Sequence, residues 1–341
     1  MEHEAGANQV LIDNNLSKVV AGLKALNISL PDPSPYTPAF EGPAIGGDTE
    51  LKALEDPGMP IGLSAENGAM LAQINKIYAY DESIDKHMCL EGEAYLTSHA
   101  LIRLDKEDYT PTVKICLGFY TKSPHLAKLS GGSVTQCDNT VAAYREGYTQ
   151  EKVALITTFT VGPSIILVDG PLQAGTYDLT MLKMEGHFAK NNILPAFVVK
   201  NSDSSVVINS DKALKDKYHS DLHWAHKTLQ AGERTSFFYY NDKINKNIHK
   251  CFAYMLPFKP SSPIRVEFHS GIYHSNPKKA HEIMDLLYYL YIVQGRNNPQ
   301  PRPIVIAEKF ARATLHLFNL RSIVAASGAF ATMNEERGMV R

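Results

Sequence analysis

Residues 165–172 read IILVDGPL, a run of four aliphatic residues that delivers the acid Asp169 and then breaks at Gly170-Pro171. Four consecutive apolar side chains without polar alternation are typical of a strand that is buried on both faces. The Gly-Pro pair ends extended structure directly after the acid. A buried carboxylate is costly, and several such acids are most simply balanced by a divalent metal ion. The stretch therefore predicts a buried strand that ends at a metal-binding active site.

The composition is that of an ordinary globular chain. Its 341 residues are 44% hydrophobic and 21% charged, which favours one large domain or a domain with sizeable insertions. No apolar run approaches the roughly 18 residues of a membrane span. The N-terminus lacks the basic segment followed by an apolar segment that is typical of a signal peptide. Four widely spaced cysteines without a CxxC pair argue against a zinc ribbon and a disulfide framework. We therefore expect a cytoplasmic protein with no membrane association.

The charges are unevenly distributed along the chain. Residues 1–66 contain ten acidic and three basic residues, a net charge of −7, whereas residues 243–312 contain eleven basic and four acidic residues, a net charge of +7. A basic C-terminal third is compatible with binding a polyanion such as nucleic acid. The alternative is that the opposite charges offset each other across the fold.

The N-terminal region differs in pattern from the rest. Apolar spacing over about residues 8–26 predicts a helix, and seven prolines in residues 30–60 predict a tether. We therefore divide the chain into residues 1–59, with this helix and tether, and a main domain over residues 60–341. A tethered helix cannot bury its apolar stripe alone, so we expect it to dock on a second protomer or a partner protein.

The main domain begins with strands and then alternates helices with strands, which predicts an α/β fold. We expect a ribonuclease-H-like mixed sheet with flanking helices and insertions. The expected strands are 61–66, 72–80, 94–104, 113–120, 165–169, 196–200, 236–240, 251–257 and 264–268. The expected helices are 140–158, 179–190, 281–293 and 304–317.

Two further acids could join Asp169. The first, Glu66, ends the predicted strand 61–66 and is followed almost at once by Gly68, although it could simply open a turn. The second, Glu151, falls in the apolar stripe of the predicted helix 140–158. Glu146, one turn earlier, is its rival, and we favour Glu151.

The last candidate acid is Glu308, which shares a helical stripe with Ile304, Ala311 and Leu315. The alternative is a surface ion pair with Arg312 at i, i+4. Glu66, Asp169 and Glu308 would supply oxygen ligands for Mg²⁺ or Mn²⁺, with Glu151 as a further catalytic acid. Two such ions can support phosphodiester hydrolysis without a nucleophilic side chain.

Five motifs then indicate a family, because they occur in the family's order. They are residues 166–172 (ILVDGPL), 197–200 (FVVK), 229–235 (LQAGERT), 264–267 (IRVE) and 295–308, which closes with PIVIAE at 303–308. In these motifs the chain resembles NurA nucleases, which work with the hexameric ATPase HerA.

This resemblance implies a metal-dependent DNA nuclease that uses Mn²⁺ or Mg²⁺, forms a homodimer, and acts with a HerA-type ATPase in DNA repair by end processing or in antiviral defence. The chain departs from the family at three places. It has Glu66 where the family has its first Asp, Glu308 where the family has a His, and Gln300 or Arg302 where the family has a Tyr. An altered but active centre is expected. The alternative is a catalytically degenerate adaptor subunit of a HerA-type complex.

We assign substrate contacts to Lys200, Arg265 and Arg302, whose cations are suited to phosphates. An equal alternative is that Lys200 is only a solvated residue at the end of a strand. The aromatic run at residues 288–291 (YYLY) is compatible with stacking on bases, and equally with a core or dimer interface.

Overall fold

The computed structural model describes residues 49–329 and 332, apart from residues 107, 132, 173–177 and 243–247. The expected helix over residues 8–26 and the tether up to residue 48 lie outside the described residues. In the described part, no helix is both long and apolar enough to cross a membrane.

The order of elements agrees with the expected change from strands to alternating helices and strands. The strands are β1 (Thr49–Ala53), β2 (Ile61–Gly62), β3 (Ile77–Met88), β4 (Glu93–Asp105), β5 (Asp108–Thr121), β6 (Thr135–Gln136), β7 (Ser164–Asp169), β8 (Ile193–Val199), β9 (Glu233–Arg234), β10 (Phe238–Asp242), β11 (Ile248–Leu256) and β12 (Ile264–His269). The helices are α2 (Ala65–Ile74), α3 (Pro124–Leu129), α4 (Thr140–Phe159), α5 (Asp178–Lys190), α6 (Val206–Asn209), α7 (Lys212–Lys215), α8 (Asp221–Thr228), α9 (Ser270–Ser275), α10 (Pro277–Gln294), α11 (Arg302–Leu315) and α12 (Leu320–Ala326).

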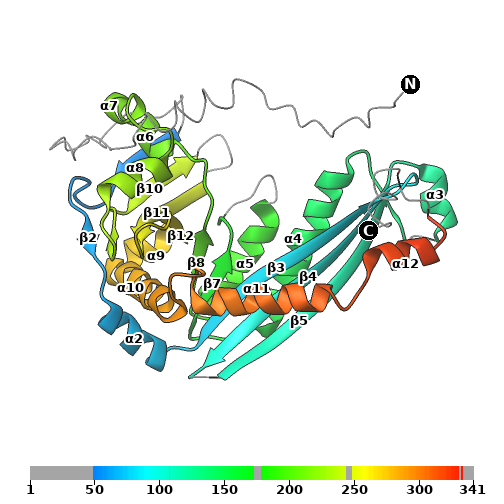
Figure 1. Ribbon diagram of the computed structural model, residues 1–341, viewed down its shortest axis with the longest axis horizontal. Coiled ribbons are helices and arrows are strands. Elements are labelled where there is room, and N and C mark those ends of the chain that lie inside the picture. Colours follow the sequence, from blue (N-terminus) through cyan, green and yellow to red (C-terminus); the bar gives the residue numbers. More distant parts are fainter. Residues whose placement is uncertain are drawn as a thin grey trace, which may run out of the picture. The chain divides into compact units, whose positions relative to one another are not determined.

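All described strands belong to one mixed sheet, which confirms the predicted fold class (Figure 1). Its order is β1-β10-β11-β12-β8-β7-β3-β4-β5-β6, with β2 and β9 attached beside β11. The strands β3, β7 and β8 are parallel, and β3, β4 and β5 form the expected antiparallel meander. The parallel strands lie at the middle of the order and are covered by helices, as parallel strands usually are.

The register of the parallel strands brings their carboxyl ends together. Tyr80 of β3 pairs with Val168 of β7, and Val168 pairs with Phe197 of β8. Because side chains alternate along a strand, residues that are neighbours in this register point to the same face. The residues that follow these three positions on their strands therefore share one face of the sheet.

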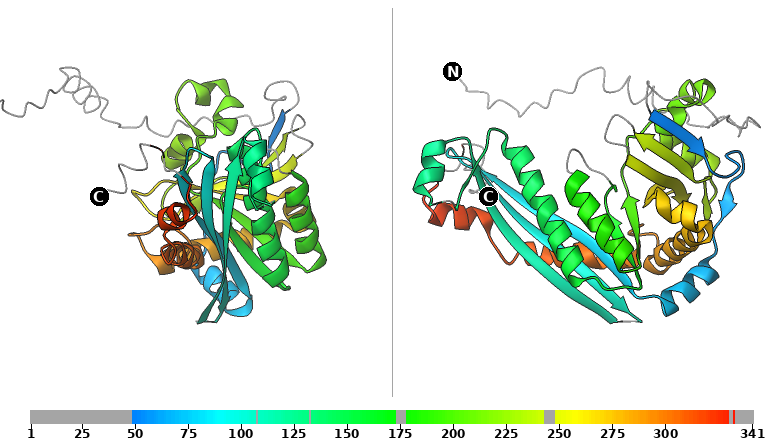
Figure 2. Two further views of the ribbon diagram at one scale, coloured as in Figure 1. Left: turned by 90° about the vertical axis from the view of Figure 1, so that its right-hand side faces the viewer. Right: turned by 180° about the vertical axis from the view of Figure 1, so that it is seen from behind.

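Helices cover both faces of the parallel strands (Figure 2), and one hydrophobic cluster lies under the helices on each face. On one face, α10 and α11 pack on Ile77 and Ala79 of β3, with Leu167 of β7 in the same cluster. On the other face, α4 and α5 pack on Tyr80 and Val168. The apolar run of residues 165–168 is divided between these two cores, which explains why it lacks polar alternation.

Three local expectations were wrong. The strand predicted over residues 61–66 ends at Gly62, and the strand predicted over residues 72–80 begins only at Ile77, because α2 occupies residues 65–74. Residues 49–53, which were expected to belong to the tether, form β1 and pair with β10. A further helix, α12, follows α11.

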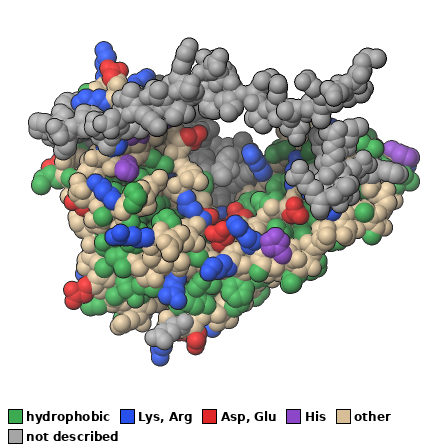
Figure 3. All heavy atoms as spheres, viewed as in Figure 1, with side chains coloured by type: hydrophobic (Ala, Val, Ile, Leu, Met, Phe, Trp, Pro, Cys, Tyr) green, Lys and Arg blue, Asp and Glu red, His purple; other side chains and the backbone are tan. Residues whose placement is uncertain are grey.

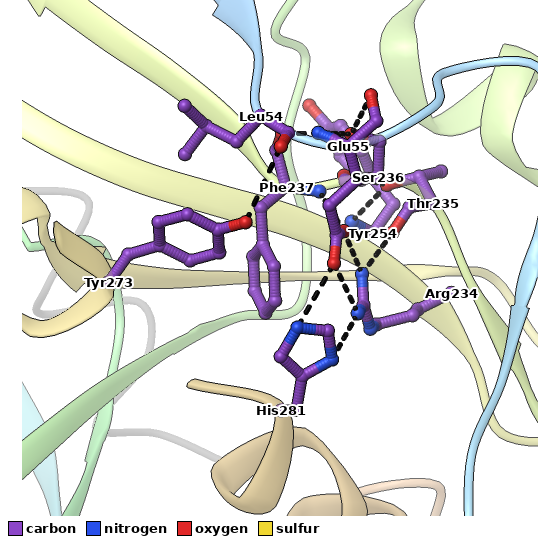
Figure 4. Close-up of polar contacts among 9 residues, drawn as sticks. All are labelled: Leu54, Glu55, Arg234, Thr235, Ser236, Phe237, Tyr254, Tyr273 and His281. Carbon is purple, nitrogen blue, oxygen red and sulfur yellow. Dashed lines mark hydrogen bonds and ion pairs between the residues drawn. The ribbon is translucent and has the colours of Figure 1, made fainter. Parts of the chain in front are cut away.

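A buried ion-pair cluster joins the loop after β1 to α10 (Figure 4). Arg234, only 1% exposed, places its two terminal nitrogens 2.7 and 3.0 Å from the carboxylate oxygens of Glu55. His281 of α10 lies 3.1 Å from Glu55 and accepts a hydrogen bond from Arg234 at 2.8 Å. The Phe237 N–H also donates to Glu55. Arg234 of the GERT motif is therefore a structural residue.

Replacing Arg234 by Ala should destabilise the fold strongly. Removing one partner of a buried pair leaves an uncompensated charge, so we expect the free energy of unfolding to fall by about 3–5 kcal/mol. Urea denaturation measures this, with the exposed Arg103→Ala on β4 as the matched control. A loss no larger than that of the control would show that the cluster does not stabilise the fold.

Candidate active site

Three charged side chains meet where β3, β7 and β8 end their parallel pairing. Asp81 follows Tyr80 on β3, Asp169 ends β7, and Lys200 follows β8 directly. By alternation, each lies on the face that carries Ala79, Leu167 and Val198, which is the face covered by α10 and α11. The register therefore places two acids and one base side by side.

The contacts within this group are short. Lys200 Nζ lies 2.9 Å from Asp169 Oδ2, and about a quarter of each side chain is exposed. Asp81 is 4% exposed and accepts a hydrogen bond of 2.8 Å from the Glu82 N–H. The site therefore combines a buried acid with a partly open acid-base pair.

The electrostatics of the site are unbalanced toward negative charge. Burial and then the Asp169 charge raise the pKa of Asp81 to about 8, although Lys200 opposes this. Burial, with a smaller contribution from Asp169, also raises the pKa of the fully buried Tyr291 on α10. The Tyr291 hydroxyl has no hydrogen-bond partner among the described residues. Two adjacent carboxylates with one lysine need a proton or another cation.

These residues fit a hard divalent cation. Mg²⁺ in proteins is commonly held by one or two carboxylates, and waters and substrate phosphates complete its shell. Asp81 and Asp169 supply such a pair. The described residues contain no group of three His, Cys, Asp or Glu side chains arranged for a metal. With Asp81 and Asp169 as its carboxylates, such a cation would complete its shell with waters and substrate oxygens.

A second buried ion pair fixes the loop that follows Asp169. Glu267 of β12 is completely buried and accepts a hydrogen bond of 2.8 Å from the Leu172 N–H. Lys250 Nζ and Arg265 Nε lie 2.8 and 2.9 Å from its other oxygen. These cations hold the pKa of Glu267 below its usual value despite burial. Arg265, which we expected to bind substrate, is directed into this internal pair instead.

Glu66 is not brought to this site. It is exposed in the first turn of α2, where acids are favoured, and Ser64 caps that helix by accepting a hydrogen bond from the Asn67 N–H. Asn67 also donates to Asp285 of α10 at 2.7 Å. The described contacts include none between Glu66 and Asp169.

Glu151 and its rival Glu146 lie on α4, which covers the opposite face of the sheet. Glu151 is ion-paired with Lys114 of β5. Glu146 is exposed and accepts a weak hydrogen bond of 3.4 Å from Gln150. Because Asp169 points to the other face, neither acid shares its site.

Glu308 lies on α11, on the same side of the sheet as Asp169. It forms the i, i+4 ion pair with Arg312 at 2.7 Å, the alternative raised by the sequence, and receives a weak hydrogen bond of 3.4 Å from Gln300. Its side chain is 26% exposed. In Figure 3, acidic and basic side chains gather at the centre of the face that α11 crosses. Glu308 therefore lies on the same side of the sheet as Asp169, but its carboxylate is paired with Arg312.

Arg302 begins α11 and lines a separate cavity of about 670 Å³, which we call the tyrosine groove. The groove is also lined by Gln73, Leu104, Lys106, Tyr109 and Tyr289, among others. Arg302 is exposed there. The structure thus separates the three predicted substrate contacts: Lys200 lies at the acids, Arg265 is internal, and Arg302 is at this groove.

Sequence reasoning missed Asp81. The run Ile77-Tyr78-Ala79-Tyr80-Asp81 has the same order as residues 165–169, four apolar residues followed by an acid. It lacks a following Gly-Pro break because β3 continues to Met88. The apolar run followed by an acid is therefore present at Asp81, but Asp81 lies within β3 and not at the end of the strand.

Comparisons with known proteins give a partial family match and a shared fold. The NurA domain family model matches residues 160–313, which include Asp169, Lys200 and Glu308. The crystal structure of the NurA nuclease from Sulfolobus solfataricus matches with a TM-score of 0.56 and 13% identity, covering 93% of this chain and 98% of that chain. No curated protein matches the chain in sequence.

Two further structures match with lower TM-scores. One is endonuclease V of Ciona intestinalis in complex with DNA, with a TM-score of 0.39 and 14% identity over 75% of this chain and 96% of that chain. The other is NurA bound to dAMP and manganese, with a TM-score of 0.38 and 9% identity over 69% of this chain and 83% of that chain. The chain therefore resembles the NurA family over residues 160–313 and shares its fold with the Sulfolobus enzyme.

Proposed function

We propose that the protein is a divalent-metal-dependent deoxyribonuclease whose metal is held by Asp81 and Asp169. The observation that carries the proposal is the pair of neighbouring carboxylates at the carboxyl ends of β3 and β7, opposed by only one lysine. A bound Mg²⁺ or Mn²⁺ would supply water activation and stabilisation of the leaving oxygen in phosphodiester hydrolysis. The match of residues 160–313 to the NurA domain family model supports a nuclease.

The residues of the chain have distinct roles in this proposal. Asp81 and Asp169 hold the cation. Lys200, now 2.9 Å from Asp169, is placed to contact a substrate phosphate when a cation replaces it as the partner of that acid. Glu267 acts through the backbone, because its hydrogen bond to the Leu172 N–H fixes the loop behind Asp169.

Glu308 is retained as a candidate third ligand, because α11 carries it over the same face. Binding a metal would require it to leave Arg312. We also propose that the protein acts as a homodimer with a HerA-type ATPase, in DNA end processing or antiviral defence. This part rests on the family resemblance alone.

The alternative is a degenerate adaptor subunit without catalysis. A single assay separates the two functions: linear single- and double-stranded DNA is incubated with the protein and Mn²⁺, with and without a HerA-type partner. Digestion that EDTA abolishes supports the nuclease. Absence of digestion even with the partner supports the adaptor.

The acid-to-amide series should identify the catalytic pair. Asp169→Asn and Asp81→Asn remove a ligand charge but keep the side-chain shape, so we expect each to lose activity by at least about a hundredfold. Glu66→Gln and Glu151→Gln are matched controls that should stay within about twofold of the parent. If the controls lose activity and the aspartate variants keep it, the assignment of the site is wrong.

Substitutions of Glu308 test its role as a ligand. Glu308→His keeps a group that can bind Mn²⁺ and should retain activity with a shift in metal preference, whereas Glu308→Ala should be markedly slower. The measurement is the cleavage rate in Mn²⁺ and in Mg²⁺. Equal, parent-like rates for both variants would leave Glu308 as only the ion-pair partner of Arg312.

Binding of Mn²⁺ should depend on pH through Asp81. Because the pKa of Asp81 is raised to about 8, a cation must displace its proton at lower pH. We expect the apparent Kd for Mn²⁺ to rise about tenfold for each pH unit below about 8. Without metal, the native state binds this proton more tightly than the unfolded chain, so Asp81 makes stability fall as pH rises from about 4 to 8.

Isothermal titration calorimetry between pH 6 and 8 measures this dependence, and buffers of different ionisation enthalpy report the released proton. Asp81→Asn should remove the release. A Kd that is constant over this range in the parent protein would contradict the proposed coupling.

A further inference from the structure

The tyrosine groove lies on the same face of the sheet as the two acids. Its lining residues Leu104 and Leu290 belong to the core under α10 and α11, and Tyr109 and Tyr289 pack against that core. Leu104 pairs with Ile77 of β3, four residues before Asp81. At the rise of a strand, the groove therefore begins about 13 Å from Asp81 along β3.

The lining of the groove has a consistent chemistry. Two tyrosines and two exposed cations, Lys106 and Arg302, border it, and the lining residues that the structure describes include no acidic side chain. Both Tyr109 and Arg302 line the groove; burial raises the pKa of Tyr109, and the charge of Arg302 opposes this shift. A ligand for this surface needs both an aromatic face and negative charge.

We propose that the tyrosine groove, which begins about 13 Å from Asp81 along β3, binds single-stranded DNA. Bases stack on Tyr109 and Tyr289, while Lys106 and Arg302 contact the phosphates. A single strand is favoured over a duplex because only unpaired bases present a free face for stacking. The volume of about 670 Å³ is within the range of small-molecule sites and holds a nucleotide unit.

The position of the groove gives it a role in the reaction. Arg302 begins α11, which crosses β3 on the face that carries Asp81. Because α11 covers Ile77 and Ala79 of β3, which are fully buried, a strand held at Arg302 would reach the acids by passing around α11. This proposal rests on the proposed nuclease function for its choice of DNA, but its own evidence is the lining of the groove.

Binding is tested without cleavage, by fluorescence anisotropy of the full chain with labelled oligothymidine in EDTA. Arg302→Ala should weaken binding severalfold and lower the slope of log K against log salt by about 0.7, the effect of one lost phosphate contact. The matched control is Arg145→Ala, an exposed arginine on α4, which covers the opposite face. It should leave both quantities unchanged.

The tyrosine is tested by a pair of variants. Tyr109→Ala should weaken binding about fivefold or more, whereas Tyr109→Phe keeps the stacking ring and should bind like the parent. Circular dichroism checks that each variant folds. If Tyr109→Ala fails to fold, Arg302→Ala still tests the proposal, because Arg302 is exposed at the first position of α11.

The proposal is overturned if Arg302→Ala binds oligothymidine as tightly as Arg145→Ala does. It is also overturned if the groove variants leave binding intact but change the mass in light scattering, because the groove would then be a protein interface. Asp169→Asn separates this result from the proposed function. If that variant still cleaves DNA while the groove variants bind weakly, the catalytic assignment fails and the groove stands.

Discussion

The structure depends most on the parallel pairing of β3 with β7. The register in which Tyr80 faces Val168 sets Asp81 beside Asp169 on one face of the sheet. Two carboxylates in such proximity repel each other, and burial adds to the cost of charging them, so the pKa of Asp81 rises. Lys200, delivered by β8 in the same way, offsets only part of this charge. The centre of the sheet is thus prepared for a cation.

The surrounding scaffold holds these strands and loops in place with buried ion pairs. Glu267 anchors the loop after Asp169, and Lys250 and Arg265 keep that carboxylate charged in the interior. Arg234 links the loop after β1 to α10 through Glu55 and His281. Arg234 and Arg265, two arginines of the family-like motifs, therefore stabilise the fold, whereas Arg302 is exposed at the tyrosine groove.

The α/β class and most elements from β4 onward were predictable, because their hydrophobic periods are long and regular. The positions of Asp169 and Lys200 at strand ends were predictable for the same reason, since each follows an uninterrupted apolar run. Glu66 was wrongly placed because Ser64, a good helix cap, was read as part of a strand. Glu151 was a periodic match on a helix, but periodicity does not show which face of the sheet that helix covers.

Asp81 and the tyrosine groove could not be predicted, because both arise from register. Asp81 becomes an active-site candidate only when β3 is aligned with β7, and the groove forms from segments far apart in sequence, including Gln73, Tyr109 and Arg302. The most direct test of the central claim is an anomalous difference map from crystals of the protein soaked in Mn²⁺. We expect a peak within coordination distance of both Asp81 and Asp169. A peak at Glu66 or Glu151, or none at the aspartate pair, would contradict the account.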